Sequence, residues 1–258
     1  MDEHAAVNRR FWDEIAPHHA ASEFYAVESF VDGADTLSPI EVAEVGDVRD
    51  KDLVHLQCHI GLDTLSWARR GAHVTGVDFS EASLEVARTL ANRTGLPAEF
   101  IGTDVVEAPE RLGHTFDIVF TTRGVLMWHG DLDAWAGACA RLLKPGGVFY
   151  LLDIHPLGMA LEPAGDGFRL TQSYFSGATP TVTSKDASYA VQDVGLTNTE
   201  TREWIHPVGA VVSALIRAGI TIEFLHEFPT DSTAPTTLTR DGVPVPELPG
   251  LFSIRGRR

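Results

Sequence analysis

Cysteine is scarce in this sequence of 258 residues. Only Cys58 and Cys139 occur, and no CxxC pair or His/Cys cluster has the spacing of a metal site. We therefore expect no structural zinc and no metal cofactor, and we predict a reducing compartment such as the cytoplasm. The sequence also lacks an apolar run of about 18 residues and the basic and apolar segments of a signal peptide. Neither a membrane span nor a membrane partner is expected.

Positive charge is in short supply as well. The 20 Lys and Arg residues are outnumbered by 36 Asp and Glu residues, and the formal net charge is −16. Such a chain repels a phosphate backbone, so we expect no nucleic-acid partner. The densest basic stretch, "RGRR" at residues 255–258, is interpreted as a solvated tail. A small-molecule substrate is the better expectation, and the chain is compatible with either a monomer or a homodimer.

Glycine is missing where a nucleotide-binding loop would need it. Residues 53–80, "LVHLQCHIGLDTLSWARRGAHVTGVDFS", are typical of a strand, a loop, a helix and a second strand, but the loop "QCHIG" has Gly61 as its only glycine. A pyrophosphate needs glycines that let backbone N–H groups approach the anion. The loop therefore counts against a dinucleotide, and it favours an adenosine ligand without phosphates, such as S-adenosylmethionine.

Short apolar segments alternate with amphipathic ones from Asp52 onward. Alternation at these lengths predicts a doubly wound α/β fold with a mostly parallel, seven-stranded, Rossmann-like sheet. Ser80 and Asp131 are predicted helix N-caps, and Gly95 is a predicted helix stop. The last two strands, "ITIEFLHEF" and "LFSIRG", are expected to form an antiparallel hairpin. Strands are predicted over residues 53–58, 73–79, 98–104, 116–122, 148–154, 220–228 and 251–256, and helices over residues 62–70, 80–94, 131–144 and 206–218.

Four parts are predicted within a single domain of residues 1–258. Residues 1–50 are expected to form an N-terminal helical lid, whose first helix should end at Pro17. Residues 52–154 would form the cofactor-binding core. Residues 156–203 are rich in Gly, Ser and Thr, and the alternating pieces "LTQSYF" and "SYAVQDV" predict a substrate-covering insertion of small antiparallel strands. Residues 204–258 would supply a helix and the last two strands.

Two acidic residues follow neighbouring predicted strands. In an open α/β sheet the ligand lies at the carboxyl ends of the strands. Asp78 closes the second strand, 21 residues after Gln57, where a carboxylate can accept hydrogen bonds from both hydroxyls of an adenosine ribose. Asp104 closes the third strand, where it can accept the adenine amino group while Phe79 or Val105 packs on the ring. Each acid could instead simply begin the next turn, but their joint occurrence favours a cofactor site.

The chain resembles the class I S-adenosylmethionine-dependent methyltransferases, and in particular their small-molecule branch. The segments that carry the resemblance are "HLQCHIGLDTLSWARRG", "VTGVDFS", "GTDV", "FDIVFTTRGVLMW" and "LLKPGGVFYLLDIHP". The first loop of that family commonly reads acid-x-G-x-G-x-G. Aligned on Gly61, this sequence has His55 at the acidic position and Gln57 and His59 at two of the glycine positions.

The resemblance implies a cofactor site at the carboxyl end of the sheet. Asp78 would hold the ribose of S-adenosylmethionine, or of its product S-adenosylhomocysteine, and Asp104 would hold the adenine amine. Gln57, His59 and Gly61 would approach the methionine part. Thr122 and Arg123 would border the cofactor after the fourth strand.

Methyl transfer needs a base only when the acceptor arrives protonated. His155, after the fifth strand, is the first candidate for a catalytic role, followed by His206 and His129. His18 and His19 of the presumed lid are weaker candidates. For each of these histidines, a structural role by capping or a hydrogen bond to the backbone is more common than a catalytic one. Trp12, Tyr25, Trp128 and Tyr174 are expected to line the pocket of the methyl acceptor, although Trp12 and its neighbour Phe11 could simply pack in an amphipathic helix.

Two other functions remain as alternatives at this point. One is an NAD(P)-dependent oxidoreductase on a similar sheet, against which the missing glycines count. The other is a non-catalytic relative that binds the cofactor.

Overall fold

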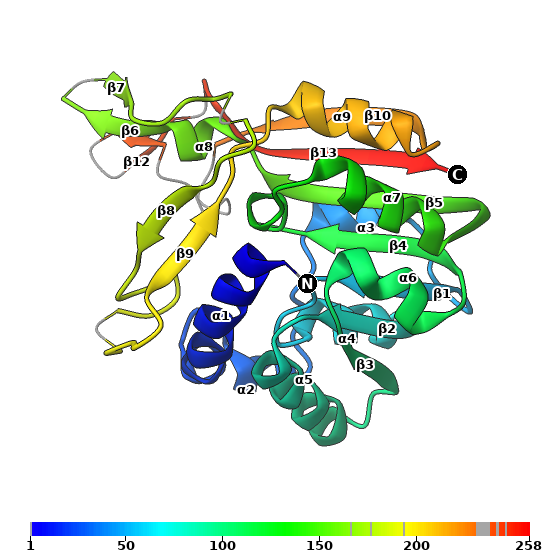
Figure 1. Ribbon diagram of the computed structural model, residues 1–258. Helices are drawn as coiled ribbons and strands as arrows, with labels where there is room; N and C mark the ends of the chain where they lie inside the picture. Colours follow the sequence, from blue (N-terminus) through cyan, green and yellow to red (C-terminus); the bar gives the residue numbers. More distant parts are fainter. Residues whose placement is uncertain are drawn as a thin grey trace.

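A seven-stranded sheet forms the centre of the computed structural model, which describes residues 2–165, 167–175, 177–192, 194–230, 238–240, 243–245 and 247–258. The strand order is β10–β13–β5–β4–β1–β2–β3 (Figure 1). Strands β1 to β5 are parallel, and β13 is antiparallel to both β5 and β10. The predicted α/β class, sheet and C-terminal hairpin are confirmed. The strands are β1 (Asp52–Leu56), β2 (His73–Asp78), β3 (Ala98–Gly102), β4 (Phe116–Thr122), β5 (Leu143–Ile154), β10 (Thr221–Pro229) and β13 (Pro249–Arg257).

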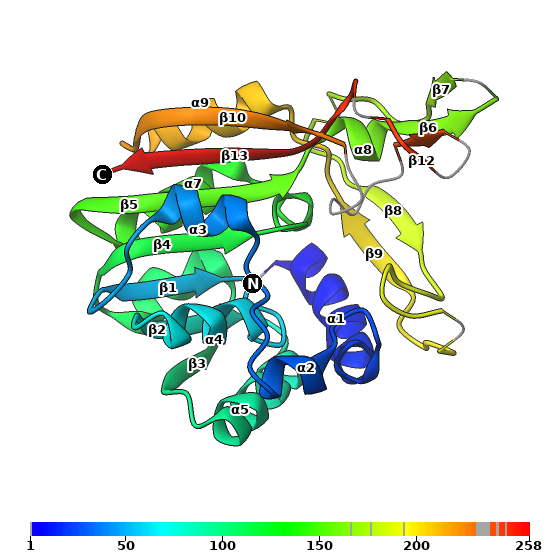
Figure 2. The ribbon, with the colours of Figure 1, turned by 180° about the vertical axis from the view of Figure 1, so that it is seen from behind.

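Helices cover both faces of the sheet, as Figures 1 and 2 show from opposite sides. On one face, Trp135 of α7 and Leu215 of α9 are fully buried in one apolar cluster with Phe149 of β5. On the other face, Trp67 of α4 packs edge-on against Phe120 of β4. The helices of these layers are α3 (Pro39–Val45), α4 (Leu62–Arg69), α5 (Glu81–Thr94), η1 (Val105–Glu107), α6 (Ala108–Leu112), η2 (Leu126–Trp128), α7 (Leu132–Leu142) and α9 (Val208–Arg217).

The predicted helix ends agree with local capping geometry. The Ser80 side chain accepts the N–H of Ser83 at the start of α5, and Gly95 ends that helix in the left-handed region. Asp131 caps α7 in the same way as Ser80 caps α5. Strand β5 begins five residues before the predicted Val148, because Leu143 already pairs with β4.

The first helix is longer than predicted. Helix α1 (Glu3–Ala21) continues past Pro17, which was expected to end it, and α2 (Val27–Val31) follows. Pro17 has no N–H to donate within the helix. The last turn is nevertheless held, because His19 is fully buried and its ring contacts His59 at 3.0 Å and Ser188 at 2.7 Å. Tertiary contacts therefore override the proline signal.

The segment after β5 forms two antiparallel hairpins, although not where the alternating pieces suggested. "LTQSYF" contributes only Leu170 to a strand, and the described part of "SYAVQDV" is a turn in which Ser188 N–H donates to Val191 O. The Pro-rich connection between β10 and β13 lies partly outside the described residues. The further elements are α8 (Leu157–Ala160), β6 (Leu161–Ala164), β7 (Gly167–Leu170), β8 (Thr181–Ser184), β9 (Glu200–Glu203), β11 (Thr239–Arg240) and β12 (Val243–Pro244).

Helix α1 lies between α5 and the β8–β9 hairpin (Figure 1). The buried Asn8 side chain makes two hydrogen bonds with the backbone of Arg202 in β9, and Glu14 accepts the N–H groups of Thr197 and Asn198. On the other side of α1, Asp13 accepts the hydroxyl of Ser80. The helix thus joins the second hairpin to the sheet.

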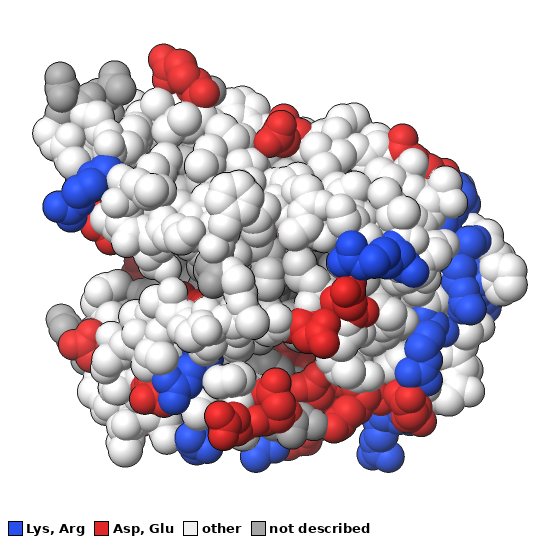
Figure 3. Space-filling model, turned by 45° about the horizontal axis from the view of Figure 1, so that its top comes forward, with Lys and Arg blue, Asp and Glu red and all other residues white. Residues whose placement is uncertain are grey.

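Acidic residues outnumber basic ones by 36 to 20 in this chain. On the face shown in Figure 3, Asp and Glu side chains gather toward the lower edge. Among the described residues, no helix is both long and apolar enough to cross a membrane.

Candidate functional site

The candidate site lies at the carboxyl ends of the parallel strands. Strand β1 has β4 on one side and β2 on the other, and its neighbours continue the sheet in opposite directions. This is the topological switch point, where open α/β sheets bind their ligands. Figure 2 shows β1 pointing toward α1, which lies over this edge.

Asp78 is buried at the end of β2 and holds two loops together. Its carboxylate accepts the backbone N–H of His59 at 2.9 Å and that of Ser80 at 2.8 Å. Burial raises the pKa of Asp78 to about 6, against the opposing effect of these two hydrogen bonds. Because a carboxylate has about four lone-pair sites, it can still accept further donors from a ligand.

Asp104 occupies the corresponding place after β3. One of its oxygens accepts the N–H of Val106, which caps η1, and burial raises the pKa of Asp104. The two neighbours expected near an adenine ring differ in exposure. Phe79 is half-buried and accessible from this edge, whereas Val105 is almost fully buried in the core. The structure thus brings the two acids to adjacent strand ends, as the sequence suggested.

The loop after β1 has a glycine-like backbone although it lacks the glycines. Of the five non-glycine residues with positive φ in the described chain, three lie at this edge: Gln57 at 57°, His59 at 49° and Arg123 at 45°. A left-handed conformation costs a side-chain-bearing residue roughly 1–2 kcal/mol. Strain of this kind clusters at functional sites.

Gly61, the third positive-φ residue of this loop, is needed for packing. Its φ is 79°, and an added Cβ would lie 2.7 Å from Ala87 Cβ of α5 and 2.9 Å from the ring of Phe100. Glycine here lets α4 start close to α5 and β3.

The side chains of Gln57 and His59 leave the loop in defined directions. Gln57 Nε2 donates to Val125 O at 2.9 Å, which joins the loop to the segment after β4. The His59 ring contacts Ser83 Oγ at 3.1 Å and the His19 ring at 3.0 Å. Burial and the neighbouring His19 lower the pKa of His59 to about 3. His55, at the position where the related loops have an acid, is also uncharged, because burial lowers its pKa to about 3.

Thr122 and Arg123 are tied to α3 by a residue that sequence reasoning missed. Glu41 is fully buried and accepts Thr122 Oγ1 at 2.8 Å and Arg123 Nη2 at 3.2 Å. Glu41 also belongs to the capping box of α3, whose S-P-I-E pattern at residues 38–41 was visible in the sequence. The side chains of Thr122 and Arg123 therefore secure α3.

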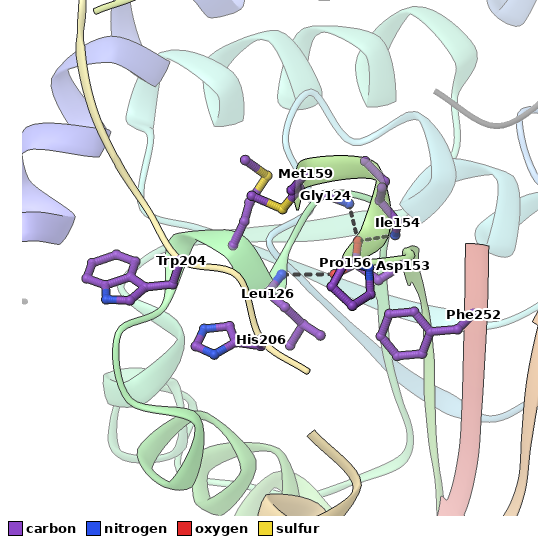
Figure 4. Close-up of a pocket in the computed structure, with 10 residues that line it drawn as sticks. Gly124, Leu126, Asp153, Ile154, Pro156, Met159, Trp204, His206 and Phe252 are labelled. Atoms are coloured by element: carbon purple, nitrogen blue, oxygen red, sulfur yellow. Dashed lines mark hydrogen bonds between the residues drawn. The ribbon is translucent and has the colours of Figure 1, made fainter. Parts of the chain in front are cut away.

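Asp153 is a strand-end residue to which sequence reasoning gave no specific role. It is buried near the end of β5, and its carboxylate accepts the N–H groups of Gly124, Val125 and Leu126, as well as its neighbour's N–H (Figure 4). One side chain thus fixes the loop that follows β4. Its only sequence signal was an acid at a strand end.

Aromatic rings from the lid segment close over the switch point. The ring centroid of Trp12 lies 5.1 Å from that of His59 and 5.4 Å from that of Trp128. Tyr25 also contacts His59, and its hydroxyl is hydrogen-bonded to that of Tyr189. Of the residues predicted to line the acceptor pocket, Trp12, Tyr25 and Trp128 therefore lie together at this edge of the sheet. Tyr174 lies apart, against the start of α9, where its hydroxyl accepts the N–H of Val208 at 3.4 Å.

The other lid candidates have ordinary places. Phe11 is buried in the packing of α1, and His18 is exposed. Of these lid residues, His19 contacts the cofactor loop through His59, and burial lowers the pKa of His19 to about 4.

The three predicted catalytic histidines differ in what their nitrogens contact. His155 accepts the N–H of Leu157 at Nδ1 and donates to Glu227 at 3.0 Å through Nε2, so both ring nitrogens are occupied. The ring centroid of His129 lies 6.4 Å from that of Trp135, and burial lowers the pKa of His129 to about 4. His206 Nε2 donates to His129 O at 2.7 Å, which leaves Nδ1 as the nitrogen with a lone pair.

A cavity of about 20 Å³ opens beside the loop that Asp153 fixes. Figure 4 shows His206 and Trp204 on one side of it and Phe252 on the other. Its volume is close to that of one water molecule. Its lining consists of Gly124, Leu126, Met127, Asp153, Ile154, Pro156, Met159, Trp204, His206 and Phe252.

Comparison with known proteins assigns the family. Residues 54–147 match a family model described as a methyltransferase domain. Residues 54–147 therefore form a methyltransferase domain, in a chain with the fold of class I S-adenosylmethionine-dependent methyltransferases. The resemblance inferred from the loop and strand-end motifs is thus confirmed.

Several ubiquinone biosynthesis O-methyltransferases are similar to about half of this chain. A ubiquinone biosynthesis O-methyltransferase of Hahella chejuensis is 32% identical over 149 residues, 57% of this chain and 57% of that protein. One of Photorhabdus laumondii is 32% identical over 135 residues, 50% of this chain and 56% of that protein. The chain therefore spans less than two thirds of the length of these relatives.

Solved structures share the fold along most of the chain. An S-adenosylmethionine dependent methyltransferase from Mesorhizobium loti has a TM-score of 0.61 and 23% identity, covering 88% of this chain and all of that one. Magnesium protoporphyrin IX methyltransferase from Synechocystis with bound SAH has a TM-score of 0.53 and 17% identity, covering 95% of this chain and 85% of that one. Among the described residues, no group of three or more His, Cys, Asp or Glu side chains could hold a metal ion.

Proposed function

We propose that this protein transfers a methyl group from S-adenosylmethionine to an oxygen, nitrogen or carbon atom of a small molecule. The observation that carries the proposal is the pair of buried acids, Asp78 and Asp104, at neighbouring strand ends beside a loop with a glycine-like backbone. Both carboxyls keep acceptor capacity on this edge, which matches the two hydroxyls of a ribose and the amino group of an adenine.

The electrostatics of the site suit a cationic cofactor. S-adenosylmethionine supplies an activated methyl group on a positively charged sulfur. Protonated imidazoles beside it would repel that charge. Burial keeps the pKa of His19 at about 4 and that of His59 at about 3, so both rings are neutral near pH 7. The loop therefore contains two histidines without adding positive charge.

The lid and the second hairpin would exclude water from the reacting groups. The chain Ser83–His59–His19–Ser188 links α5, the cofactor loop, α1 and the β8–β9 segment through contacts of 2.7 to 3.1 Å. The hydroxyl pair of Tyr25 and Tyr189 joins the same segments. Alignment and exclusion of water are the main contributions a protein makes to such a displacement. We therefore assign residues 1–50 as the lid and residues 156–203 as the cap.

We propose that the acceptor binds over the loop after β4, next to the proposed cofactor loop, and that the small cavity there takes only its reacting group. His206 lines this cavity, and the bond from Nε2 to His129 O leaves Nδ1 able to accept a proton. His206 would serve as the base when the acceptor arrives protonated. Both ring nitrogens of His155 are engaged, so we assign it no part in the chemistry. The names of the curated relatives make hydroxyl acceptors the first class to assay.

Calorimetry with S-adenosylmethionine, S-adenosylhomocysteine and NADH tests the proposal. We expect the first two to bind and NADH not to bind. The absence of binding by either adenosyl ligand would refute the function. Once an acceptor is known, His206→Gln should lower kcat for a hydroxyl acceptor with little change in cofactor affinity, and an unchanged kcat would remove the base assignment.

A further inference from the structure

Gln57 carries two energetic costs that glycine would avoid. Its backbone has a φ of 57°, in the left-handed region. Its side-chain oxygen Oε1 is buried and accepts no hydrogen bond from the described residues. Buried polar atoms are nearly always satisfied, so an unpaired one at a strained residue points to a functional role.

The orientation of the Gln57 amide is fixed by its other end. Nε2 donates to Val125 O, and Val125 belongs to the loop that Asp153 holds. Oε1 is therefore the end of the amide that can accept a hydrogen bond, and it lies beside the cofactor loop. Trp12 of α1 lies near both loops, since its ring contacts those of His59, two residues after Gln57, and Trp128, three residues after Val125.

The hydrogen-bond donors of the cofactor allow an assignment by elimination. S-adenosylmethionine offers the adenine amino group, two ribose hydroxyls and the α-ammonium of its methionine part. Asp104 and Asp78 account for the first three. Resting on the proposed function, we propose that Gln57 Oε1 accepts a hydrogen bond from the α-ammonium and so positions the methionine part of the cofactor.

The charges around the loop agree with this assignment. His55 is neutral, so the carboxyl end of β1 supplies no charge to balance an ammonium. Asp63 lies in the first turn of α4, where its carboxyl accepts the Thr36 hydroxyl. Burial and the nearby Glu41 raise the pKa of Asp63 to about 7, against the opposing effects of the Thr36 hydroxyl and Arg123. An ammonium bound near this carboxyl would favour its charged form.

Two variants and two ligands test the role of Gln57. Gln57→Met keeps the length of the side chain without an acceptor at its tip, and Gln57→Gly also removes the left-handed strain. The ligands are S-adenosylhomocysteine and its deamino analogue, in which hydrogen replaces the α-amino group. By calorimetry, both variants should bind S-adenosylhomocysteine about ten-fold more weakly than the wild type. Their affinity for the deamino analogue should change less than about two-fold.

Asp50→Gly is the matched control for strain. Asp50 has a φ of 58° and precedes β1, at the opposite edge of the sheet. This variant should leave the affinity for both ligands unchanged, and its thermal midpoint should not fall. Equal weakening of both ligands, or no weakening of S-adenosylhomocysteine, would overturn the role of Gln57 alone. If the wild type binds neither ligand, the proposed function itself fails.

Discussion

Replacing Asp78 is the sharpest test of the cofactor site. The ribose of an adenosyl ligand would offer two hydroxyls to this carboxylate, and hydrogen bonds to charged groups contribute roughly 1.5–3 kcal/mol each. Asp78→Ala removes both, so the affinity for S-adenosylhomocysteine should fall by about two to four orders of magnitude. Asp78→Asn keeps one acceptor oxygen and should lose roughly one to two orders.

The pH dependence of binding gives a second, independent readout of Asp78. Burial raises its pKa from the ordinary value of 3.8 to about 6. Because the folded value is the higher one, protonation stabilises the free fold, and this contribution grows as the pH falls from about 6 toward 3.8. The ligand needs the charged form, so affinity should fall about ten-fold between pH 7.5 and pH 5. Asp78→Asn should remove this part of the pH dependence.

Calorimetry at both pH values, with the 2′-deoxy analogue of S-adenosylhomocysteine as a second ligand, completes the test. The wild type should discriminate against the 2′-deoxy analogue more strongly than Asp78→Asn does. Asp63, with a pKa of about 7, also titrates in this range, so only the difference between wild type and variant reports on Asp78. If Asp78→Asn binds like the wild type at pH 7.5, Asp78 does not hold the ribose.

Two further predictions concern packing and closure. Gly61→Ala should destabilise the fold by about 1–3 kcal/mol in chemical denaturation. The new Cβ would lie 2.7 Å from Ala87 Cβ, at a residue whose φ is 79°. An unchanged denaturation midpoint would mean that α4 and α5 can move apart without cost. Lowering the pH from 7.5 to 5.5 should reduce the protection factors of the α1 amides, which compare each exchange rate with the intrinsic rate at the same pH. Burial holds the pKa of His19 at about 4 and that of His59 at about 3, so opening binds protons below the ordinary value of 6.5 and the closed, neutral pair loses stability as the pH falls. His19→Asn should flatten this response, and an equal loss of protection in that variant would contradict the explanation.

Local signals predicted the framework of this protein well. The caps at Ser80 and Asp131 depend on side chains that bond within three residues, and the acids at Asp78 and Asp104 follow from strand ends. Long-range partners could not be predicted in this way. Glu41 reaches Thr122 across 81 positions, and a single sequence contains no signal of that pairing.

The sequence also could not predict which way the ring of a histidine points. His155 and His206 each stand before a proline at the active edge of the sheet, and chain position favoured His155. The structure turns the His155 ring toward Glu227 on β10, where both nitrogens are engaged. His206 is anchored by one nitrogen only. Which histidine has a basic nitrogen to offer is decided by residues 72 and 77 positions away.

The loop after β4 would hold the cofactor and the acceptor in fixed positions relative to each other. Gln57 holds Val125 O from the cofactor side, and Asp153 holds the N–H groups of residues 124–126 from the cavity side. A short segment gripped through both its carbonyl and its amides has little freedom to shift. Since methyl transfer is an in-line displacement, a shift of one substrate relative to the other would misalign the reacting atoms. The replacement of glycine by Gln57 thus has a structural consequence beyond the cofactor, because glycine has no side chain with which to hold Val125.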